Sequence, residues 1–198
     1  MSEVVLASAS PRRKQLLSLL LADFRCSPMD VDESLFSGET PERYVLRLAR
    51  LKAAAALKSG RVVIGSDTTV CLRGELLHKP QDYDDAYGML SRLSGQTHQV
   101  FTAIAVARDS MIRDAVVRTD VVFDSLDDQL ISTYINTGEC WDKAGAYGIQ
   151  GFAGSFVKEI RGSFSSVVGL PLRETRLLLG EFGVELTPAV NTRSPSDA

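Results

Sequence analysis

Cysteine and histidine are scarce in this chain of 198 residues, and their scarcity excludes two kinds of site. The three cysteines, Cys26, Cys71 and Cys140, are odd in number and far apart in the sequence. That distribution argues against a disulfide framework and predicts a reducing, cytoplasmic location. Two histidines, His78 and His98, together with such dispersed cysteines cannot form a zinc site of ordinary ligand spacing.

An excess of one charge sign is also missing, since 22 Lys and Arg face 25 Asp and Glu and the net charge is -3. This balance excludes a general nucleic-acid binder, which needs a strongly basic surface. No uncharged apolar run reaches the roughly 18 residues that a membrane span needs. The opening MSEVVLAS lacks the basic region of a cleavable signal. We therefore expect a cytoplasmic protein that binds neither nucleic acid nor membrane.

Two familiar nucleotide motifs are absent. No Gly-Lys-Ser/Thr follows a glycine-rich loop, and no G-x-G-x-x-G follows a predicted strand, so P-loop and dinucleotide-binding sites of the usual kind are excluded. What the chain does have is a hydrophobic content of 44%, enough for one good core or for two lobes with a cleft between them.

Strand and helix patterns interleave along the chain and predict an α/β fold with a mixed sheet. The strand 61–72 is expected to break around Gly65–Asp67 and to be followed by a turn at Arg73–Gly74. Residues 1–186 are expected to form a single domain, and the polar segment 187–198 a disordered tail. The expected strands are 3–7, 61–72, a short segment ending at 80, 98–108, 112–123 and 154–163, and the expected helices are 11–22, 41–58, 83–94, 126–137 with Ser125 as its cap, and 170–183.

The segment SASPRRK places three cations where a helix is already positive. Ser10 and Pro11 predict the helix start, because Ser caps a free N–H group and Pro has none to cap. Arg12, Arg13 and Lys14 then lie in the first turn, where the helix dipole disfavours cations. Either this is a solvated basic turn, or backbone N–H groups, a Ser hydroxyl and Arg side chains together bind an anion with phosphate geometry.

Asp67 follows the apolar run VVIGS and is expected where a strand ends, the place where ligands collect in open α/β sheets. Its carboxylate either caps a turn or acts in such a site. Enzymes that form an aspartyl-phosphate commonly carry another carboxylate two residues further on, and this chain has Thr69 there. The sequence therefore indicates that Asp67 is a base or a metal ligand rather than a nucleophile.

The acidic segment DVDES, which includes Glu33, is either solvated surface or part of a site for a hard cation such as Mg²⁺ or Mn²⁺. Lys52 is expected at the border of the buried face of the helix 41–58, and Lys79 in extended backbone before a proline. Both positions also suit ordinary surface lysines. The glycines of WDKAGAYGIQG either permit close approach of the backbone to a ligand or form an ordinary tight connection.

Eight segments, in order, resemble the Maf family of nucleoside triphosphate pyrophosphatases: LASASPRRKQLL, VDES, YVLRLARLKA, IGSDTTV, HKPQD, LSGQTHQVFTAI, WDKAGAYGIQG and VVGLPL. The resemblance covers residues 4–180. It implies an α/β fold with an elongated mixed sheet flanked by helices and two lobes around a central cleft, related to the inosine triphosphate pyrophosphatases. It also implies hydrolysis of a nucleotide to the monophosphate and pyrophosphate with a divalent metal, and it suggests a homodimer.

The resemblance further implies roles for individual residues. Asp67 matches the family's proton acceptor. Glu33 is expected to hold the metal, Mg²⁺ or Mn²⁺, and Asp67 to be base, metal ligand or both. Arg12, Thr68 and Gln150 match positions linked to substrate choice. The other polar positions expected to line the cleft and bind substrate are Ser8, Arg13, Lys52 and Lys79.

Ser66 bears on the choice of substrate, because the branch of the family that acts on dTTP and UTP usually has Ala there. A sister branch that acts on 7-methyl-GTP shares the Ser, but typically differs at Thr68 and lacks AYGIQG. The matches at Thr68 and AYGIQG outweigh the match at Ser66, so we expect dTTP and UTP as substrates. The Gln150 carboxamide is expected to pair with the edge of thymine or uracil. The alternatives are 7-methyl-GTP hydrolysis and a regulator of septum formation that binds nucleotide without hydrolysing it.

Overall fold

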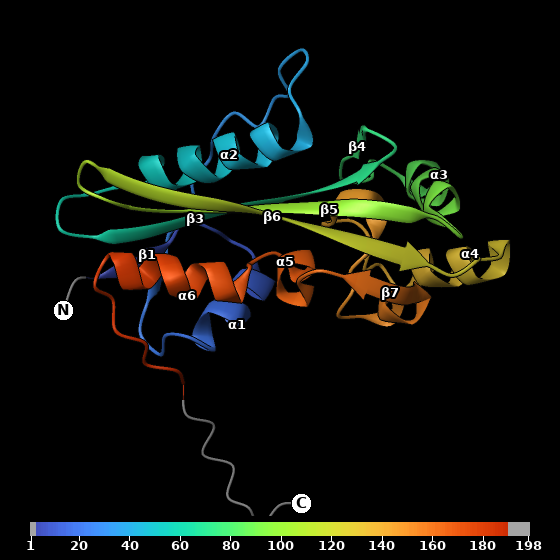
Figure 1. The fold of residues 1–198 in the computed structure, drawn as a ribbon. Coiled ribbons are helices and arrows are strands. Elements are labelled where there is room, and N and C mark those ends of the chain that lie inside the picture. The colour runs from blue at the N-terminus through green and yellow to red at the C-terminus, as the bar shows by residue number, and fades with distance from the viewer. Residues whose placement is uncertain (1–2, 190–198) are drawn as a thin grey trace, which may run out of the picture.

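A computed structural model describes residues 3–189, and a seven-stranded mixed sheet runs through its length (Figure 1). The strand order is β2-β1-β3-β5-β6-β7, with β4 paired to the end of β3. Strands β1, β2 and β3 are parallel, and β4, β5, β6 and β7 pair antiparallel to their neighbours. The strands are β1 (Val4–Leu6), β2 (Arg25–Cys26), β3 (Val62–Leu72), β4 (Glu75–Leu77), β5 (Thr97–Arg108), β6 (Met111–Phe123) and β7 (Val157–Arg161).

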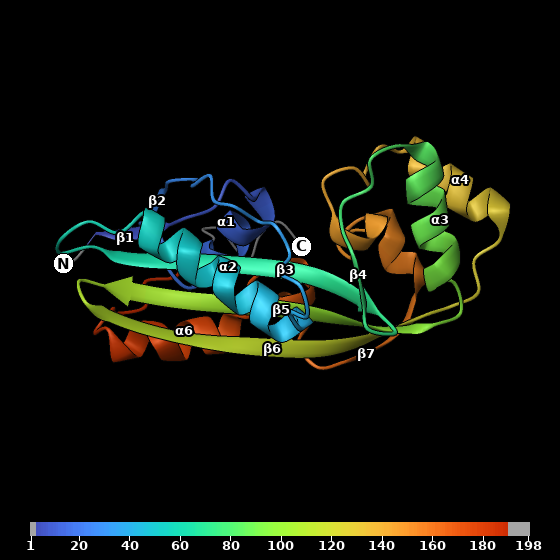
Figure 2. The same ribbon diagram turned by 90° about the horizontal axis from the view of Figure 1, so that it is seen from above.

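Helices cover both faces of this sheet. Helix α2 lies along one face, α1, α5 and α6 lie on the other, and α3 and α4 gather at the far end of the long strands (Figures 1 and 2). The expected elongated α/β fold is therefore confirmed, including its division into two lobes. The helices are α1 (Pro11–Ser18), α2 (Pro41–Ala55), α3 (Tyr83–Leu93), α4 (Asp128–Asn136), α5 (Phe164–Val168) and α6 (Leu172–Glu181), with short 3-10 helices η1 (Ala144–Ala146) and η2 (Phe152–Phe156).

The main correction concerns β3, which is continuous where a break was predicted. The strand has eleven residues, of which Val63 to Cys71 pair with β5 without interruption, and Asp67 lies opposite Ala103 in the middle of the strand rather than at its end. A carboxylate is tolerated there because cations from two helices lie beside it. The predicted turn at Arg73–Gly74 is confirmed, with positive φ angles of 51° and 87° that lead directly into β4.

The helix starts were predicted better than the helix ends. Ser10, Thr40 and Asp82 each cap their helix by accepting a hydrogen bond from the N–H group three residues on. The cap of α4 is Asp127 and not Ser125, because Leu126 N–H is held by the Ser94 hydroxyl and the helix begins only after it. Helix α1 ends at Ser18 and α2 at Ala55, both shorter than predicted, and α5, η1 and η2 were not predicted.

Helix α2 touches β3 at one glycine. A Cβ atom on Gly65 would lie 2.1 Å from the carbonyl oxygen of Ala49, so any side chain would push the helix away from the strand. Side chains along the buried face of α2, including Leu48 and Ala53, pack against the sheet. Lys52 belongs to this buried face, where it was expected only at the border. The close approach brings Lys52 to the neighbourhood of Asp67.

Three hydrophobic clusters hold the layers together. The first lies between α2 and the sheet, the second between the other face and α1 with α6, and the third beneath α3 and α4. The fully buried His98 packs against Phe123 and Tyr147 of the third cluster, and its Nε2 lies 2.8 Å from the Tyr147 hydroxyl. Burial lowers the pKa of His98 to about 4, so the ring is neutral at physiological pH.

The first residues of the expected tail remain in contact with the body, since Thr187 N–H donates to the Leu20 carbonyl. The rest of that segment, 190–198, lies outside the described residues. Between residues 3 and 189 no helix has both the length and the apolar character to cross a membrane. The cytoplasmic location and the homodimer stay predictions.

We expect Gly65→Ala to lower the free energy of unfolding by about 3 kcal/mol, because its Cβ would overlap the Ala49 carbonyl and force α2 outward. Urea denaturation measures the loss. The control is Gly88→Ala in α3, whose Cβ would meet nothing within 4 Å and which should be neutral or stabilise by up to about 1 kcal/mol. Equal stability of the two variants would contradict the close contact.

Candidate active site

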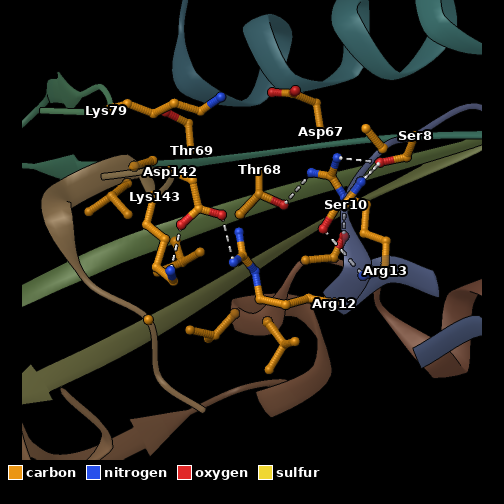
Figure 3. Close-up of a pocket in the computed structure, with 18 of the residues that line it drawn as sticks. Ser8, Ser10, Arg12, Arg13, Asp67, Thr68, Thr69, Lys79, Asp142 and Lys143 are labelled. Carbon is orange, nitrogen blue, oxygen red and sulfur yellow. Dashed lines mark hydrogen bonds and ion pairs between the residues drawn. The ribbon is translucent and has the colours of Figure 1, made fainter. Parts of the chain in front are cut away.

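A cleft of about 690 Å³ opens between α1, α2, the middle of β3 and the segment 142–151 (Figure 3). It brings together side chains that lie far apart in the sequence and come from both lobes. Every site residue predicted from the sequence lines it. These residues are Ser8, Arg12, Arg13, Glu33, Lys52, Asp67, Thr68, Lys79 and Gln150.

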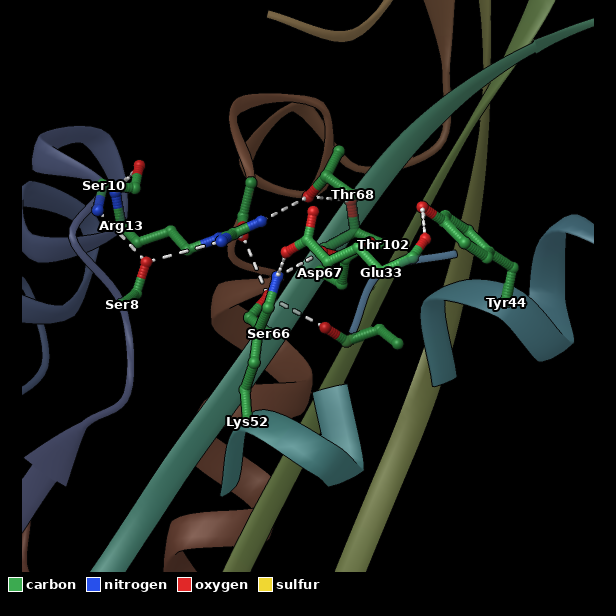
Figure 4. Close-up of polar contacts among 12 residues, drawn as sticks. Ser8, Ser10, Arg13, Glu33, Tyr44, Lys52, Ser66, Asp67, Thr68 and Thr102 are labelled. Carbon is green, nitrogen blue, oxygen red and sulfur yellow. Dashed lines mark hydrogen bonds and ion pairs between the residues drawn. The ribbon is translucent and has the colours of Figure 1, made fainter. Parts of the chain in front are cut away.

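Lys52 lies between two carboxylates at the centre of the cleft. Its Nζ is 2.7 Å from Asp67 Oδ1 and 2.7 Å from Glu33 Oε1 (Figure 4). Asp67 is buried, whereas half of the Glu33 side chain is exposed. The Tyr44 hydroxyl donates to the backbone carbonyl of Glu33 at 3.0 Å and so fixes the acidic loop against α2. Tyr44 was missed in the sequence, although it lies eight residues before Lys52 on the same helix face.

The two carboxylates differ in their protonation. Burial raises the pKa of Asp67, and the charges of Lys52 and Arg13 only partly oppose this rise. Partial burial by itself would raise the pKa of Glu33. The hydrogen bond and the charge of Lys52 outweigh burial, so the pKa of Glu33 is lowered. Asp67 is therefore the better proton acceptor of the pair near neutral pH.

Arg13 points from the first turn of α1 into the cleft, and neutral groups hold it there. Its Nε donates to the Gly169 carbonyl at 2.9 Å, Nη1 to the Ser8 hydroxyl at 3.4 Å and Nη2 to the Thr68 hydroxyl at 3.2 Å. Two of its five N–H groups, one on each terminal nitrogen, have no partner among residues 3–189. The guanidinium thus keeps both charge and donors for an anion.

Arg12 lies at the rim and reaches across the cleft. Its Nη1 is 3.0 Å from Asp142 Oδ2, and Asp142 also accepts from Lys143 (Figure 3). Hydrogen bonds from Lys143 and Arg12 lower the pKa of Asp142 in spite of its partial burial. Asp142 therefore offsets part of the positive charge at the start of α1. No signal in the sequence pairs these residues, which are 130 positions apart.

The wall opposite α1 is the glycine-containing segment before η2. Gly145 N–H donates to the His78 carbonyl, and Gly148 N–H donates to the Tyr134 hydroxyl. A Cβ atom on Gly148 would lie 2.4 Å from Cε of Lys143, so a side chain there would displace the end of that lysine. This bracing presents the exposed Gln150 to the cleft, which Lys79 also lines.

A family model described as Maf-like protein matches residues 3–182 of this chain. The chain belongs to the Maf family. Curated relatives of this Maf protein named dTTP/UTP pyrophosphatase occur in Shewanella denitrificans (54% identity; 88% of this chain, 93% of the relative), Anaeromyxobacter dehalogenans (51%; 92% and 95%) and Escherichia coli (49%; 92% and 94%). The solved Staphylococcus aureus Ham1 protein aligns with 62% of this chain and 71% of its own at 22% identity and a TM-score of 0.44, too distant a likeness to support an argument.

Ser66 in this Maf protein does not belong to the cleft wall. Its buried hydroxyl lies 2.8 Å from the Ala103 carbonyl and 3.1 Å from the Gly169 carbonyl, and these two acceptors share its one proton. The side chain thus ties β3 to β5 and to the turn after α5. It also steadies the same carbonyl that accepts from Arg13.

The donor set of the cleft suits a hard divalent cation held jointly with substrate. Glu33 and Asp67 each place one carboxylate oxygen 2.7 Å from Lys52 Nζ, so the two carboxylates lie close together, and Mg²⁺ is commonly bound by one or two carboxylates together with phosphate oxygens and water. No group of three or more His, Cys, Asp or Glu residues able to hold a metal occurs between residues 3 and 189. The protein by itself supplies only part of such a coordination shell.

Lys52→Met should lower the free energy of unfolding by about 3 kcal/mol at pH 7, because it leaves the buried Asp67 carboxylate without its closest cation. The deficit should shrink as the pH falls, since the pKa of Asp67 rises further in the variant and its protonation removes the unpaired charge. Urea denaturation between pH 7 and pH 4 measures both effects. The double variant Lys52→Met/Asp67→Asn should recover most of the loss; no recovery would show that the ion pair is not the cause.

Proposed function

We propose that this chain hydrolyses nucleoside triphosphates, dTTP and UTP above all, to the monophosphate and pyrophosphate. The observation that carries the proposal is the convergence, in one cleft, of a buried carboxylate with five cationic side chains. Asp67 supplies the carboxylate, and the cations are Arg12, Arg13, Lys52, Lys79 and Lys143. The names of the curated relatives support the same reaction.

The phosphate chain is bound by the cations and donors around the start of α1. A triphosphate carries about four negative charges, which resist attack at phosphorus until they are neutralised. Arg13 offers two N–H groups, and the Ser8 hydroxyl accepts from Arg13 and from Ser10 N–H, so its own proton is available to a phosphate oxygen. Lys79 and Arg12 balance the charge of the departing pyrophosphate.

Asp67 acts as the general base. Lys52 occupies Oδ1 of its carboxylate, which leaves Oδ2 to accept a proton from the attacking water. The water oxygen forms a bond to the α-phosphorus, the bond from the α-phosphorus to the bridging oxygen breaks, and pyrophosphate leaves. Burial supports this role, because the raised pKa makes Asp67 a stronger base than an exposed aspartate.

A divalent cation, Mg²⁺ or Mn²⁺, would be held by Glu33 and Asp67 together with phosphate oxygens. It would supply further charge neutralisation at the phosphates. Lys52 holds the two carboxylates close together and limits their repulsion.

The structure favours pyrimidine substrates over 7-methyl-GTP on one specific observation. Ser66, which matches the sister branch, donates its hydroxyl inside the protein and is not part of the cleft wall. The exposed carboxamide of Gln150 lies in that wall, with one donor and one acceptor side for the edge of thymine or uracil.

We expect the purified protein with Mg²⁺ or Mn²⁺ to release pyrophosphate fastest from dTTP and UTP, more slowly from CTP, and poorly from ATP and GTP. EDTA should abolish the activity. A coupled pyrophosphate assay on this panel, with 7-methyl-GTP included, measures it. A preference for 7-methyl-GTP would assign the protein to the sister branch, and nucleotide binding without turnover would indicate a regulator.

In the same assay Gln150→Ala should lower kcat/KM for dTTP by roughly tenfold to a hundredfold and narrow the lead over CTP, because a hydrogen bond to the base is lost. Ser66→Ala is the control and should keep the wild-type order of substrates, since its hydroxyl faces two backbone carbonyls. A change of base preference in Ser66→Ala alone would contradict this assignment.

Asp67→Asn should lower kcat by about a hundredfold to ten-thousandfold while dTTP still binds. In the wild type, kcat/KM should fall as the pH drops through the pKa of Asp67, because only the ionised carboxylate accepts a proton, and this limb should lie above the ordinary value of 3.8. Steady-state kinetics and calorimetric binding measure both. Asp142→Asn, which changes another carboxylate of the cleft, is the control and should keep the acid limb of the kcat/KM profile. Near-full turnover by Asp67→Asn would exclude the base role.

A further inference from the structure

We propose that Thr102 is a positioning residue that aims the Arg13 guanidinium into the cleft by way of Thr68. Thr102 has no exposed surface and lies on β5, behind the strand that forms the cleft floor. The inference rests on the proposed triphosphate hydrolysis for its kinetic readout, but its geometry stands on contacts within the protein. It also assigns to Thr68 a task other than reading the base.

Four groups form a chain of contacts from α5 to α1. The Ser166 carbonyl lies 2.7 Å from Thr102 Oγ1, and Thr102 Oγ1 lies 3.0 Å from Thr68 Oγ1. Thr68 Oγ1 in turn lies 3.2 Å from Nη2 of Arg13. Figure 4 shows Thr102, Thr68 and Arg13 in this order across the cleft floor. Each contact joins different elements, so the chain links α5, β5, β3 and α1.

Counting protons gives the chain a direction. The Ser166 carbonyl can only accept, and Thr102 is the donor in its contacts with that carbonyl and with Thr68 Oγ1, so its one proton is shared between the two acceptors. Thr68 therefore presents one lone pair to Thr102. Its other lone pair faces Nη2 of Arg13, which can only donate. Both lone pairs of the Thr68 hydroxyl are thus engaged within the protein.

The other contacts of Arg13 show why its orientation depends on Thr68. Nε is held by the Gly169 carbonyl, and Nη1 is held only loosely by Ser8, at 3.4 Å. Because the guanidinium is planar, the contacts at both of its ends set its rotation together, and the Thr68 contact is the one at the far end. That rotation decides where the two unpartnered N–H groups point. A phosphate bound through a planar fork is sensitive to such an angle.

Thr102→Val keeps the shape of the side chain and removes the hydroxyl. Thr68 then loses the donor that holds one of its lone pairs, and its hydroxyl can rotate so that its proton, instead of a lone pair, faces Arg13. The Ser166 carbonyl loses a donor as well, which costs stability. Stability loss alone would not distinguish positioning from packing, so the test needs a matched variant.

Thr175 supplies that match. It too is fully buried, and its hydroxyl donates to the Pro171 carbonyl at 2.8 Å, but it lies on α6 and does not touch the Arg13 chain. Thr175→Val therefore removes the same chemical group from the same kind of site. Thr102→Ser keeps the hydroxyl of the relay and serves as the rescue variant.

The experiment compares steady-state kinetics of Thr102→Val, Thr102→Ser and Thr175→Val on dTTP, UTP and CTP with Mg²⁺. Thr102→Val should raise KM about tenfold for all three nucleotides alike, with kcat changed less than about threefold, because a phosphate contact does not depend on the base. Thr102→Ser and Thr175→Val should keep the wild-type KM. A wild-type KM in Thr102→Val, or an equal rise in Thr175→Val, would overturn the proposal.

A double-mutant cycle tests whether the two threonines act as one unit. Thr68→Val should raise KM uniformly across the three nucleotides, and Thr68→Val/Thr102→Val should raise it no further than Thr68→Val alone. A KM in the double variant that rises by the product of the two single effects would show that Thr68 acts independently of Thr102. A KM change in Thr68→Val confined to one base would show that Thr68 reads the base.

A readout that needs no turnover separates this inference from the proposed function. The exchange rate of the Arg13 Nη protons, assigned by their absence in Arg13→Lys, is measured by NMR in the protein without nucleotide. It should rise about tenfold in Thr102→Val and stay unchanged in Thr175→Val. If the wild type hydrolyses no triphosphate, the proposed function fails, and this exchange rate still decides the role of Thr102; equal rates in the wild type and Thr102→Val would overturn it.

Discussion

The contact between the Lys52 ammonium and the buried Asp67 carboxylate is the interaction on which the cleft depends. A carboxylate in the middle of a central strand is costly to bury without a cation beside it. Lys52 can reach Asp67 because Gly65 lets α2 lie directly on β3. The same ammonium draws in Glu33, and with it the acidic loop that Tyr44 holds against α2. One ion pair therefore organises two walls of the cleft.

Successive side chains of β3 lie on alternate faces of the strand, and the two faces have different roles in the cleft. Gly65 and Asp67 point toward α2, whereas Ser66 and Thr68 point toward α1 and α5, because successive side chains of a strand lie on opposite sides. Acid–base chemistry is thus assembled on one face, and the support for Arg13 on the other. A break in the strand at this point would have uncoupled them.

Two of the three cations at the start of α1 also find a physical explanation. Asp142 offsets Arg12 from across the cleft, while Arg13 is held by a carbonyl and two hydroxyls that do not neutralise it. Arg13 therefore keeps an unpaired positive charge next to a helix N-terminus, and both attract an anion. Burial lowers the pKa of Arg13, but an arginine remains charged at any physiological pH.

The sequence by itself determined the features that depend on near neighbours: the caps at Ser10, Thr40 and Asp82, the turn at Arg73–Gly74, and the order of motifs that indicated the family. It also indicated which polar residues gather in the cleft. Only the tertiary structure decided that β3 runs unbroken past Asp67, and which partners hold the Arg and Thr side chains. Arg13 meets Gly169 across 156 positions, and Thr68 meets Thr102 across 34. Local propensity cannot encode such pairs, because each exists only after helix and strand have packed against the sheet and excluded water from between them.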